Sequence, residues 1–397
     1  MAGKTTKRAP GQPLTAAEKR EMRRRRARRR AVLRVVVLVA LCAVLVLLWQ
    51  NWDSLAPGKL LNRFQDMIGS STGSYPVDLS GVSVRRLDRS QNYSVLLTDS
   101  HLIYLNSDGA EVNRHVCSYS TALLRTAGRY VLVAEQGGRR LQLSTRSAVV
   151  TELTVDQDII TVALNERGQM AVLTHGLQGY AVQVKVYDRN GKLLYTRSRN
   201  HAVTEVALSR DGSQMALLSV ESVDGTLNTL LDVFSLETAD TGALCSYTAQ
   251  DTLLYRMEYM DGHWLVAFSE DSVVMLDTAD GLATVYKPQG LRVLGYAVSE
   301  ETLALALRPY GDTGDGEVQV VSKTGEPSCS VAFTGTFRHL AEENGQYVLL
   351  TDAYAQRIAA AGAAGTAQVG SDGQQVVLDG DRAVVLGLNR LVAFELE

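Results

Sequence analysis

The feature that most constrains the fold of this chain is a pattern of paired strands that recurs from Tyr75 onward. The segment "TVALNERGQMAVLT" (residues 161–174) aligns with "EVALSRDGSQMALLS" (residues 205–219), about 44 positions further along. Looser copies begin at Arg256, Leu294 and Arg338. Each copy has the pattern of a strand, a tight turn and then a strongly apolar strand, which predicts an antiparallel hairpin.

A third strand and a weaker fourth follow most of these hairpins, so the repeating unit has four strands in about 40 to 50 residues. Such a unit is apolar on both faces and needs a neighbour on each side, which indicates a blade of a closed β-propeller. We expect an all-β propeller with eight blades, with seven as the alternative, and we place the unit starts near Val82, Thr121, Ile159, Val203, Leu253, Leu291, Thr336 and Gln374.

The last unit contains only three strands, in "QQVVLDGDRAVVLGLNRLVAFELE" (residues 374–397). The extended segment "YPVDLS" (residues 75–80) precedes the first unit and is available as the missing outer strand. Pairing the two ends in this way closes the ring and covers a strand edge that would otherwise be open to aggregation. We therefore predict that residues 75–80 complete the eighth blade.

The N-terminal segment changes from arginine-rich to wholly apolar within a few residues. Val35 begins a run of 15 residues without a polar side chain that ends at Trp49, and Arg34 is the one interruption back to residue 31. Nineteen helical residues span about 28 Å, close to the thickness of a bilayer core. Arg34 can extend its guanidinium to the headgroups on one side, while Trp49 and Trp52 favour the opposite interface. We predict a basic tail (1–30), an uncleaved transmembrane signal-anchor helix (31–52), a linker (53–75) and the propeller (76–397).

Charge asymmetry supports this orientation. Residues 1–34 carry 13 Lys and Arg against two Glu, whereas the remainder carries 27 basic and 41 acidic residues. Basic flanks stay on the cytoplasmic side, so we expect a single-pass protein of the cytoplasmic membrane whose C-terminal domain lies outside. The helix contacts the lipid bilayer, and the arginine tail attracts anionic lipid of the inner leaflet. A cleaved signal peptide and a nucleic-acid-binding arm are the alternatives, and we expect no nucleic acid partner.

The residues offer no linear catalytic, cofactor or metal motif. "GSSTG" (residues 69–73) matches G-x-S-x-G but lies in a polar linker without the required preceding strand. Asp211 and Asp261 lie in Asp-Gly turns, where a structural role is expected, and Trp264 is expected in the core. Cys117, Cys245 and Cys329 are read as small core residues. The acidic loop "YGDTGDGE" (residues 310–317) could hold calcium, but it lacks the D-x-D-x-D-G order and a suitable downstream glutamate, so we expect a solvated hairpin loop. We assign no catalytic, cofactor-binding or metal-binding residue.

The tail, the single span, the linker and blade cores of the "SRDGSQMALLS" type resemble an uncharacterised, domain-of-unknown-function family of single-pass, membrane-anchored WD40-like β-propeller proteins of Gram-positive bacteria. The resemblance implies an exported, tethered ring without an assigned activity. We expect a non-catalytic binding or scaffold module that holds a protein or envelope component on its propeller face. The alternative is an extracytoplasmic hydrolase or lyase with its site in the central channel, assembled from different blades.

Overall fold

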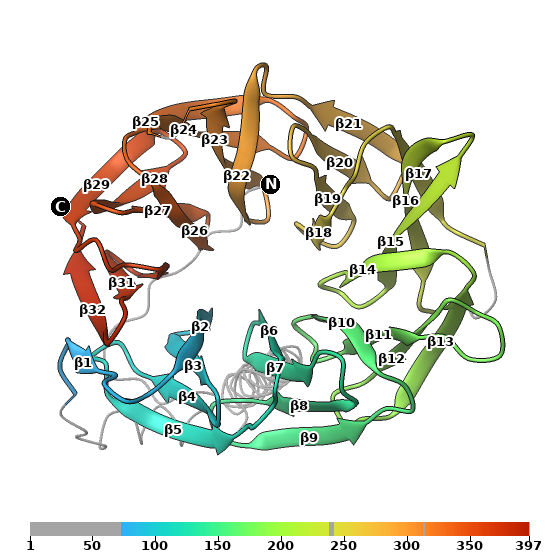
Figure 1. The fold of residues 1–397 in the computed structure, drawn as a ribbon, viewed down its shortest axis with the longest axis horizontal. Coiled ribbons are helices and arrows are strands. Elements are labelled where there is room, and N and C mark those ends of the chain that lie inside the picture. Colours follow the sequence, from blue (N-terminus) through green and yellow to red (C-terminus); the bar gives the residue numbers. More distant parts are fainter. Residues whose placement is uncertain (1–72, 238–241, 313, 397) are drawn as a thin grey trace, which may run out of the picture. The chain divides into compact units, whose positions relative to one another are not determined.

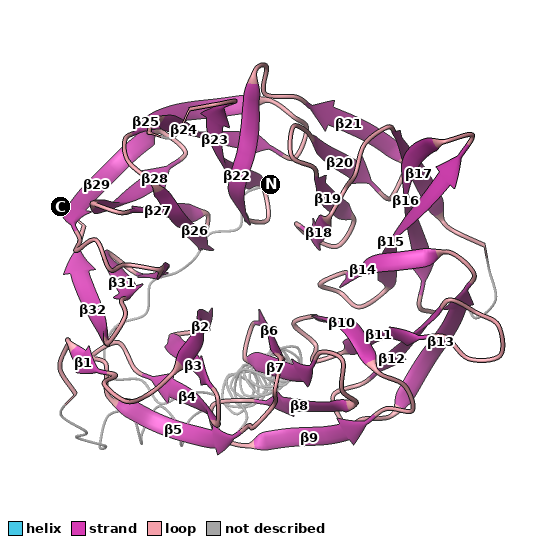
Figure 2. Cartoon of the chain, in the orientation of Figure 1, coloured by secondary structure: helices cyan, strands magenta, loops and turns pink. Residues whose placement is uncertain are grey.

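The computed structural model describes residues 73–237, 242–312 and 314–396, and every regular element among them is a β-strand. These strands form eight antiparallel sheets of four strands each, arranged as blades around a central channel (Figure 1, Figure 2). The prediction of an all-β propeller with eight blades is confirmed, and the seven-bladed alternative is wrong. The tail, the predicted membrane helix with Arg34, Val35, Trp49 and Trp52, and most of the linker lie outside the described residues.

The strands follow one another outward through each blade, and blade 8 alone takes its outermost strand from the other end of the chain. Blades 1 to 4 consist of β2 (Val84–Ser90), β3 (Tyr93–Thr98), β4 (His101–Leu105), β5 (Glu111–Val116); β6 (Ala122–Ala127), β7 (Tyr130–Glu135), β8 (Arg140–Ser144), β9 (Val149–Thr154); β10 (Ile159–Leu164), β11 (Met170–His175), β12 (Val182–Tyr187), β13 (Leu193–Arg199); and β14 (Ala202–Leu208), β15 (Gln214–Val223), β16 (Thr226–Ser235), β17 (Cys245–Gln250). Blades 5 to 8 consist of β18 (Arg256–Tyr259), β19 (Trp264–Phe268), β20 (Val273–Asp277), β21 (Leu282–Tyr286); β22 (Leu291–Val298), β23 (Thr302–Pro309), β24 (Gly316–Ser322), β25 (Pro327–Phe333); β26 (Phe337–Glu343), β27 (Gln346–Thr351), β28 (Tyr354–Ala359), β29 (Gly362–Gln368); and β30 (Gln375–Asp379), β31 (Arg382–Leu386), β32 (Arg390–Glu395), β1 (Val77–Asp78).

The predicted unit starts agree closely with the first strand of each blade. Ile159 and Leu291 are the first residues of β10 and β22, as the repeat predicts. The largest difference is in blade 5, where the repeat predicts Leu253 and the strand begins at Arg256. The intervening residues form the connection from blade 4, and the backbone N–H of Leu254 donates a hydrogen bond to the Thr229 hydroxyl at 3.2 Å.

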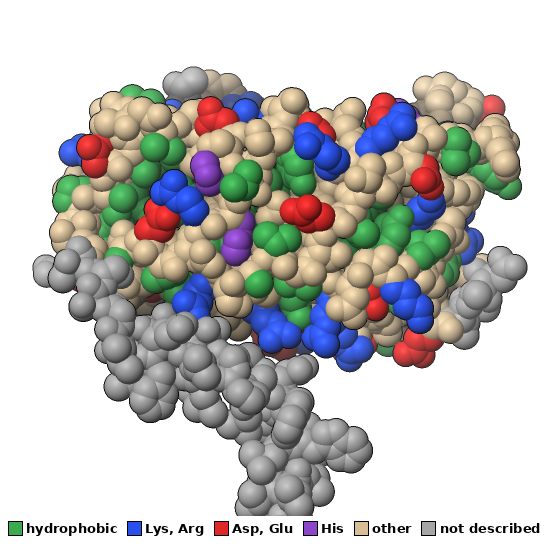
Figure 3. Space-filling model, turned by 90° about the horizontal axis from the view of Figure 1, so that it is seen from below, with side chains coloured by type: hydrophobic (Ala, Val, Ile, Leu, Met, Phe, Trp, Pro, Cys, Tyr) green, Lys and Arg blue, Asp and Glu red, His purple; other side chains and the backbone are tan. Residues whose placement is uncertain are grey.

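The hydrophobic core is divided among the blade interfaces. Each of eight clusters of buried residues joins two adjacent blades, as where Leu87 and Leu96 of blade 1 meet Val384 and Leu391 of blade 8. The second strands are accordingly buried on both faces, and all but the last residue of β7 is buried. On the part of the rim that Figure 3 shows, hydrophobic side chains are interspersed with basic, acidic and other polar ones. The blades are therefore held together by apolar packing between neighbours.

Ring closure uses the two ends of the described chain. Val77 pairs with Leu391 and Asp78 with Arg390, and the N–H of Leu79 donates to the Asn389 carbonyl at 2.9 Å. The β4–β5 turn of blade 1 packs on this strand at Gly109, whose φ is +80°. A Cβ at Gly109 would lie 2.9 Å from a methyl carbon of Val77, so a larger residue there would be strained and crowded. The prediction that residues 75–80 supply the fourth strand of the last blade is confirmed.

The closing segment can be tested by shortening one buried side chain. Leu79 is 6% exposed and belongs to the cluster between blades 8 and 1. We expect Leu79→Ala to lower the free energy of unfolding by about 2–4 kcal/mol, because it removes buried methyl groups and leaves a cavity. Val82, which follows the turn after the closing strand and is 42% exposed, provides the control: Val82→Ala should change stability by less than about 0.5 kcal/mol. Equal effects in urea denaturation would contradict a closing role for this segment.

Candidate functional site

The central channel is lined by the first strand of each blade, as the inner ring of strands in Figure 1 shows. A cavity of about 550 Å³ in this channel is bounded by residues of seven blades, from Arg86 of β2 to Glu342 of β26. Its lining includes arginines and carboxylates on strands that pack apolar side chains against the neighbouring blades. We therefore regard Arg86, Asp88, Arg125, Glu205, Arg256 and Glu258 as the candidate site, and we call them the channel cluster.

Glu205 of β14 is the anchor of the channel cluster. Its side chain is 7% exposed and forms a close ion pair with Arg256 of β18. Arg125 of β6 approaches a Glu205 carboxylate oxygen to 3.9 Å, and the Thr161 hydroxyl lies 3.4 Å from the same oxygen. A buried carboxylate requires such compensation. Through these contacts the Glu205 side chain of blade 4 interacts with blades 2, 3 and 5.

Two further carboxyl groups in the channel have raised pKa values. Water can reach the Glu258 side chain, but the surrounding ring removes much of its hydration. This desolvation raises its pKa to about 7, although Arg125 and Arg256 act in the opposite direction. The pKa of Asp88 is also raised by burial, against a 2.8 Å hydrogen bond from the Arg89 N–H. Both carboxyls are thus poised to accept a cation or to share a proton.

Arg86 and Tyr296 also line the channel cavity. Arg86 is exposed to the channel and has no hydrogen bond or ion pair with any other residue in the described part of the chain. The Tyr296 ring stacks on Phe268 with ring centres 3.7 Å apart, which fixes its position. His339 of β26 is neutral near pH 7, because burial and then the charge of Arg86 lower its pKa to about 4. Arg86 therefore offers an uncommitted cation beside a neutral imidazole.

Ion pairs between turns narrow one end of the channel. Arg210, in the turn after β14, lies 3.5 Å from Glu166 of blade 3 and forms a close ion pair with Glu300 of blade 6. The second contact passes over blade 5. Glu342 lies nearby, and its pKa is raised mainly by burial. This end of the channel is thus bridged by side chains, whereas Arg86 and Arg256 lie near the beginnings of their strands at the other end.

The channel cluster can bind a polar group and can exchange a proton. Arg86 provides hydrogen-bond donors, and the carboxyl groups of Glu258 and Asp88 provide acceptors. A carboxyl with a pKa near 7 is present in both protonation states at neutral pH, as general acid–base chemistry requires. Cavity, donors and acceptors therefore converge on the same part of the channel.

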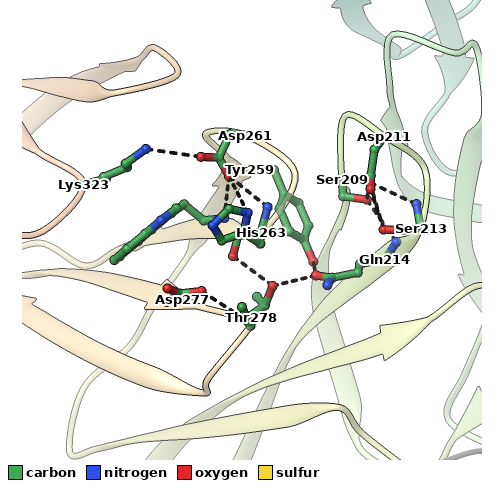
Figure 4. Close-up of polar contacts among 12 residues, drawn as sticks. Ser209, Asp211, Ser213, Gln214, Tyr259, Asp261, His263, Asp277, Thr278 and Lys323 are labelled. Carbon is green, nitrogen blue, oxygen red and sulfur yellow. Dashed lines mark hydrogen bonds and ion pairs between the residues drawn. The ribbon is translucent and has the colours of Figure 1, made fainter.

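The turn aspartates have the structural role that the sequence predicts (Figure 4). Asp211 accepts hydrogen bonds from the hydroxyl of Ser209 at 2.6 Å and from the N–H of Ser213 at 3.1 Å. Asp261 accepts from the N–H groups of His263 and Trp264, each at 2.8 Å. Both carboxylates close hairpin turns by satisfying the backbone of the residues that follow.

A second contact in Figure 4 connects blades 4 and 5. The side-chain oxygen of Gln214 accepts from the Thr278 hydroxyl at 2.8 Å and from the Tyr259 hydroxyl at 3.4 Å. Lys323 of the next blade lies 3.5 Å from Asp261. These contacts fix the positions of adjacent blades and leave no carboxylate of this group facing the channel cavity.

Other residues singled out in the sequence lie apart from the channel cluster. Trp264 is partly buried against the cluster between blades 5 and 6, as expected. Cys117 is buried, whereas Cys245 and Cys329 are only half-buried, and all three are free thiols. Within the described part of the acidic loop 310–317, and in the rest of the described chain, no group of three potential metal-ligating side chains is found. Among the described residues no helix is present that could cross a membrane.

The channel cluster was not predicted from the sequence. Its signal is the presence of charges in first strands that otherwise pack between blades, as in "VRRLDRS" of β2 and "RMEY" of β18. Such alternation is typical of a half-exposed strand. Only the ring brings Arg86, Asp88, Arg125, Glu205, Arg256 and Glu258 to one cavity.

The raised pKa of Glu258 predicts a specific pH dependence of stability. In the folded state the Glu258 carboxyl keeps its proton up to about pH 7, whereas in the unfolded chain it loses the proton near the ordinary glutamate pKa of 4.5. The contribution of Glu258 to the free energy of unfolding therefore falls as the pH rises from about 4.5 to about 7. We expect the free energy of unfolding of the wild type to decline relative to that of Glu258→Gln over this interval. Urea denaturation at a series of pH values measures the difference.

Glu111 provides the control for this prediction, because its hydrogen bond from Arg114 lowers its pKa. Its contribution is lost only as the pH falls below the ordinary glutamate value, so Glu111→Gln should give a constant difference between about pH 5 and pH 8. A constant difference for Glu258→Gln as well would show that the ring does not desolvate this carboxyl.

Solved structures show the same fold. The chain is similar to a chain from a structural and mechanistic study of two prolyl endopeptidases, with 12% identity, a TM-score of 0.51 and coverage of 76% of this chain and 52% of that one. It is also similar to apo AztD from Citrobacter koseri (12% identity, TM-score 0.49, 71% and 85% covered) and to the Pan2 WD40 domain of Neurospora crassa (10% identity, TM-score 0.46, 79% and 89% covered). At 12% identity, the likeness to the chain from the prolyl endopeptidase study indicates the fold alone.

No curated protein matches the chain. A family model, described as a family of unknown function (DUF5711), matches residues 77–368, from the closing strand β1 to the end of β29 in blade 7. The match covers most of the propeller, including all strands that carry the channel cluster. The chain therefore belongs to the DUF5711 family.

Proposed function

We propose that this protein is a membrane-tethered binding module whose propeller lies outside the cytoplasmic membrane and holds a protein or envelope component at its channel. The observation that carries the proposal is that Arg86 and Glu258, neither of which forms an ion pair among the described residues, line one cavity of about 550 Å³. A ligand with both acceptor and donor groups would satisfy both residues.

The ring favours binding because it holds these groups in place before a ligand arrives. Arg86 and Glu258 extend from strands in blades 1 and 5, whose positions are set by packing against neighbours on both sides. Rigid presentation lowers the entropy that is lost on association. Desolvated polar groups without protein partners also gain more from a ligand than solvated groups do. We therefore assign the channel cluster a recognition role.

The location rests on the sequence of residues 1–52. The arginine-rich tail followed by the apolar run 31–52 has the composition of a signal anchor, with Arg34 on the cytoplasmic side and Trp49 and Trp52 at the outer interface. Anionic inner-leaflet lipid would contact the tail, at about 1 kcal/mol for each basic residue near the surface. The linker 53–75 would then place the propeller in the envelope.

One observation favours an alternative function as an extracytoplasmic hydrolase or lyase. Glu258 has a pKa of about 7, and Asp88 and the arginines Arg125 and Arg256 act on it electrostatically. A carboxyl of this kind can serve as a general acid or base, and nearby guanidinium groups can stabilise a developing anion. The channel-centred enzyme thus uses the same residues as the binding module, and experiment must separate the two.

Topology is the first prediction of the proposed function. An epitope tag placed after Glu397 should be removed by protease added to intact spheroplasts, while a cytoplasmic protein survives. Replacing Arg23–Arg26 and Arg28–Arg30 with glutamine should reduce the fraction that is oriented in this way, because the positive-inside bias is weakened. Protection of the tag in the unmodified chain would contradict an external propeller.

Ligand recognition is the second prediction. The described ring has its own closed core, so residues 73–397 can be purified alone and crosslinked to envelope extract of the native host. We expect one reproducible partner, and we expect Arg86→Ala to reduce its recovery about tenfold or more, as for a central contact. Arg114→Ala, which removes an exposed ion pair with Glu111 on the outside of blade 1, provides the control and should not change recovery.

The same purified ring, residues 73–397, can be used to test the alternative enzymatic function. Incubation with ester, glycoside and peptide substrates would reveal turnover that Glu258→Gln abolishes if the channel is catalytic. Turnover of this kind would replace the binding module with the alternative. Unchanged partner recovery by Arg86→Ala, together with the absence of turnover, would contradict both functions for the channel cluster.

A further inference from the structure

One face of the ring carries a row of exposed apolar side chains. The turns between second and third strands lie on this face, together with the connections from one blade to the next, because successive turns of an antiparallel blade alternate between its two ends. Blades 3 to 6 present large exposed side chains there, at Tyr180, Val223, Leu227, Leu253, Tyr255 and Tyr310. Three of them, Leu253, Tyr255 and Tyr310, border one groove, and an exposed apolar groove indicates a surface that can bind a partner.

The apolar row contains a groove between blades 5 and 6, with a volume of about 690 Å³. Its apolar walls are Leu253 and Tyr255, in the connection before β18, Leu294 of β22, and Tyr310 after β23. Leu253, Tyr255 and Tyr310 are 49%, 41% and 56% exposed, so the side chains face the groove without being covered. Two tyrosines and two leucines therefore form an open site of the size of a few amino-acid side chains.

Carboxylates line the same groove. Asp251, Glu270 and Asp271 belong to its lining, and Glu270 and Asp271 lie in the turn after β19. The pKa of each tyrosine hydroxyl is raised, first by desolvation and then by Glu270. For Tyr310 the charge of Asp271 acts in the same direction and that of Arg292 in the opposite one. Glu270 is therefore within electrostatic reach of both rings. Aromatic faces beside carboxylates attract a cationic group.

Arg292 is the one basic side chain of the groove lining. Its Nε atom is buried and has no hydrogen-bond acceptor among the described residues. The groove thus combines carboxylates, apolar and aromatic side chains and a single guanidinium group.

We propose that the groove between blades 5 and 6 binds an extended peptide segment of a partner protein in which a lysine or arginine neighbours an apolar residue. The basic side chain lies between the two tyrosine rings and pairs with Glu270 or Asp271. The apolar residue packs on Leu253 and Leu294. This site is distinct from the channel cluster and does not depend on what the channel holds.

The probe for this proposal is a fluorescein-labelled hexapeptide of alternating lysine and leucine, with a second peptide in which glutamate replaces each lysine. Fluorescence anisotropy with purified residues 73–397 should show saturable binding of the lysine peptide and at least about tenfold weaker binding of the glutamate peptide. Glu270→Lys should weaken the lysine peptide about tenfold, because it reverses the charge that faces both rings. Tyr310→Ala should weaken it about fivefold or more, and Tyr310→Phe should restore most of the affinity.

Two control variants separate this site from general adhesion and from the channel. Leu282→Ala removes a 68% exposed leucine from the outer strand of blade 5 and should leave peptide affinity unchanged. Arg86→Ala in the channel should also leave the peptide affinity unchanged. The peptide-binding proposal and the channel-binding proposal can therefore be contradicted independently of each other. Circular dichroism and thermal unfolding confirm that each variant is folded.

Three results would overturn the proposal. Equal binding of both peptides would show adhesion to apolar surface without charge recognition. A concentration-dependent dimer that Tyr310→Ala abolishes, measured by sedimentation, would assign the groove to a second copy of the chain. Peptide binding by the isolated ring that is absent from the full chain in detergent would assign it to the arginine-rich segment of the chain itself.

Discussion

The whole structure depends on the sharing of each hydrophobic core between two blades. No blade contains a core of its own: Leu87 and Leu96 of blade 1 are buried only because Val384 and Leu391 of blade 8 cover them. An isolated blade would expose both faces of its sheet, and a row of blades would expose one face at each end. Closure removes the last two open faces, so the short pairing between Val77 and Leu391 has an importance beyond its two residues.

Closure also determines the character of the channel. The first strands surround the axis of the ring. Side chains at their inner edges are not covered by a neighbouring blade, and they share a confined cavity with little bulk water. Glu205 is compensated by arginines from two other blades, which shows how charges brought together by the ring are stabilised across it. The same arginines act on Glu258 without forming an ion pair with it, and the desolvation of Glu258 outweighs their effect on its pKa. Arg86 and Glu258 are therefore the groups through which the channel can act on a ligand.

The sequence is informative about the ring and much less so about its sites. Blade number, the unit starts and the closing strand follow from local patterns, because each hairpin carries its own alternation and turn residues, as in "SRDGSQMALLS". The roles of Asp211 and Asp261 are local for the same reason. The channel cluster could not be found in this way, since Arg86 and Glu258 are far apart in sequence and each resembles an ordinary exposed residue of its strand. The groove between blades 5 and 6 likewise combines three separate turns and connections.

The closing strand has a consequence for how this protein reaches its native state. Val77 is among the first residues of the ring to be synthesised, and its partner Leu391 is among the last. The earlier blades can form while translation proceeds, but the unpaired strand and the uncovered flank of blade 1 must remain exposed until blade 8 is complete. A pairing with so large a sequence separation forms slowly, because the entropy of joining distant segments is lost before the packing is gained. Throughout that interval the nascent chain presents open β-edges, so its yield depends on protection from aggregation until the final hairpin emerges.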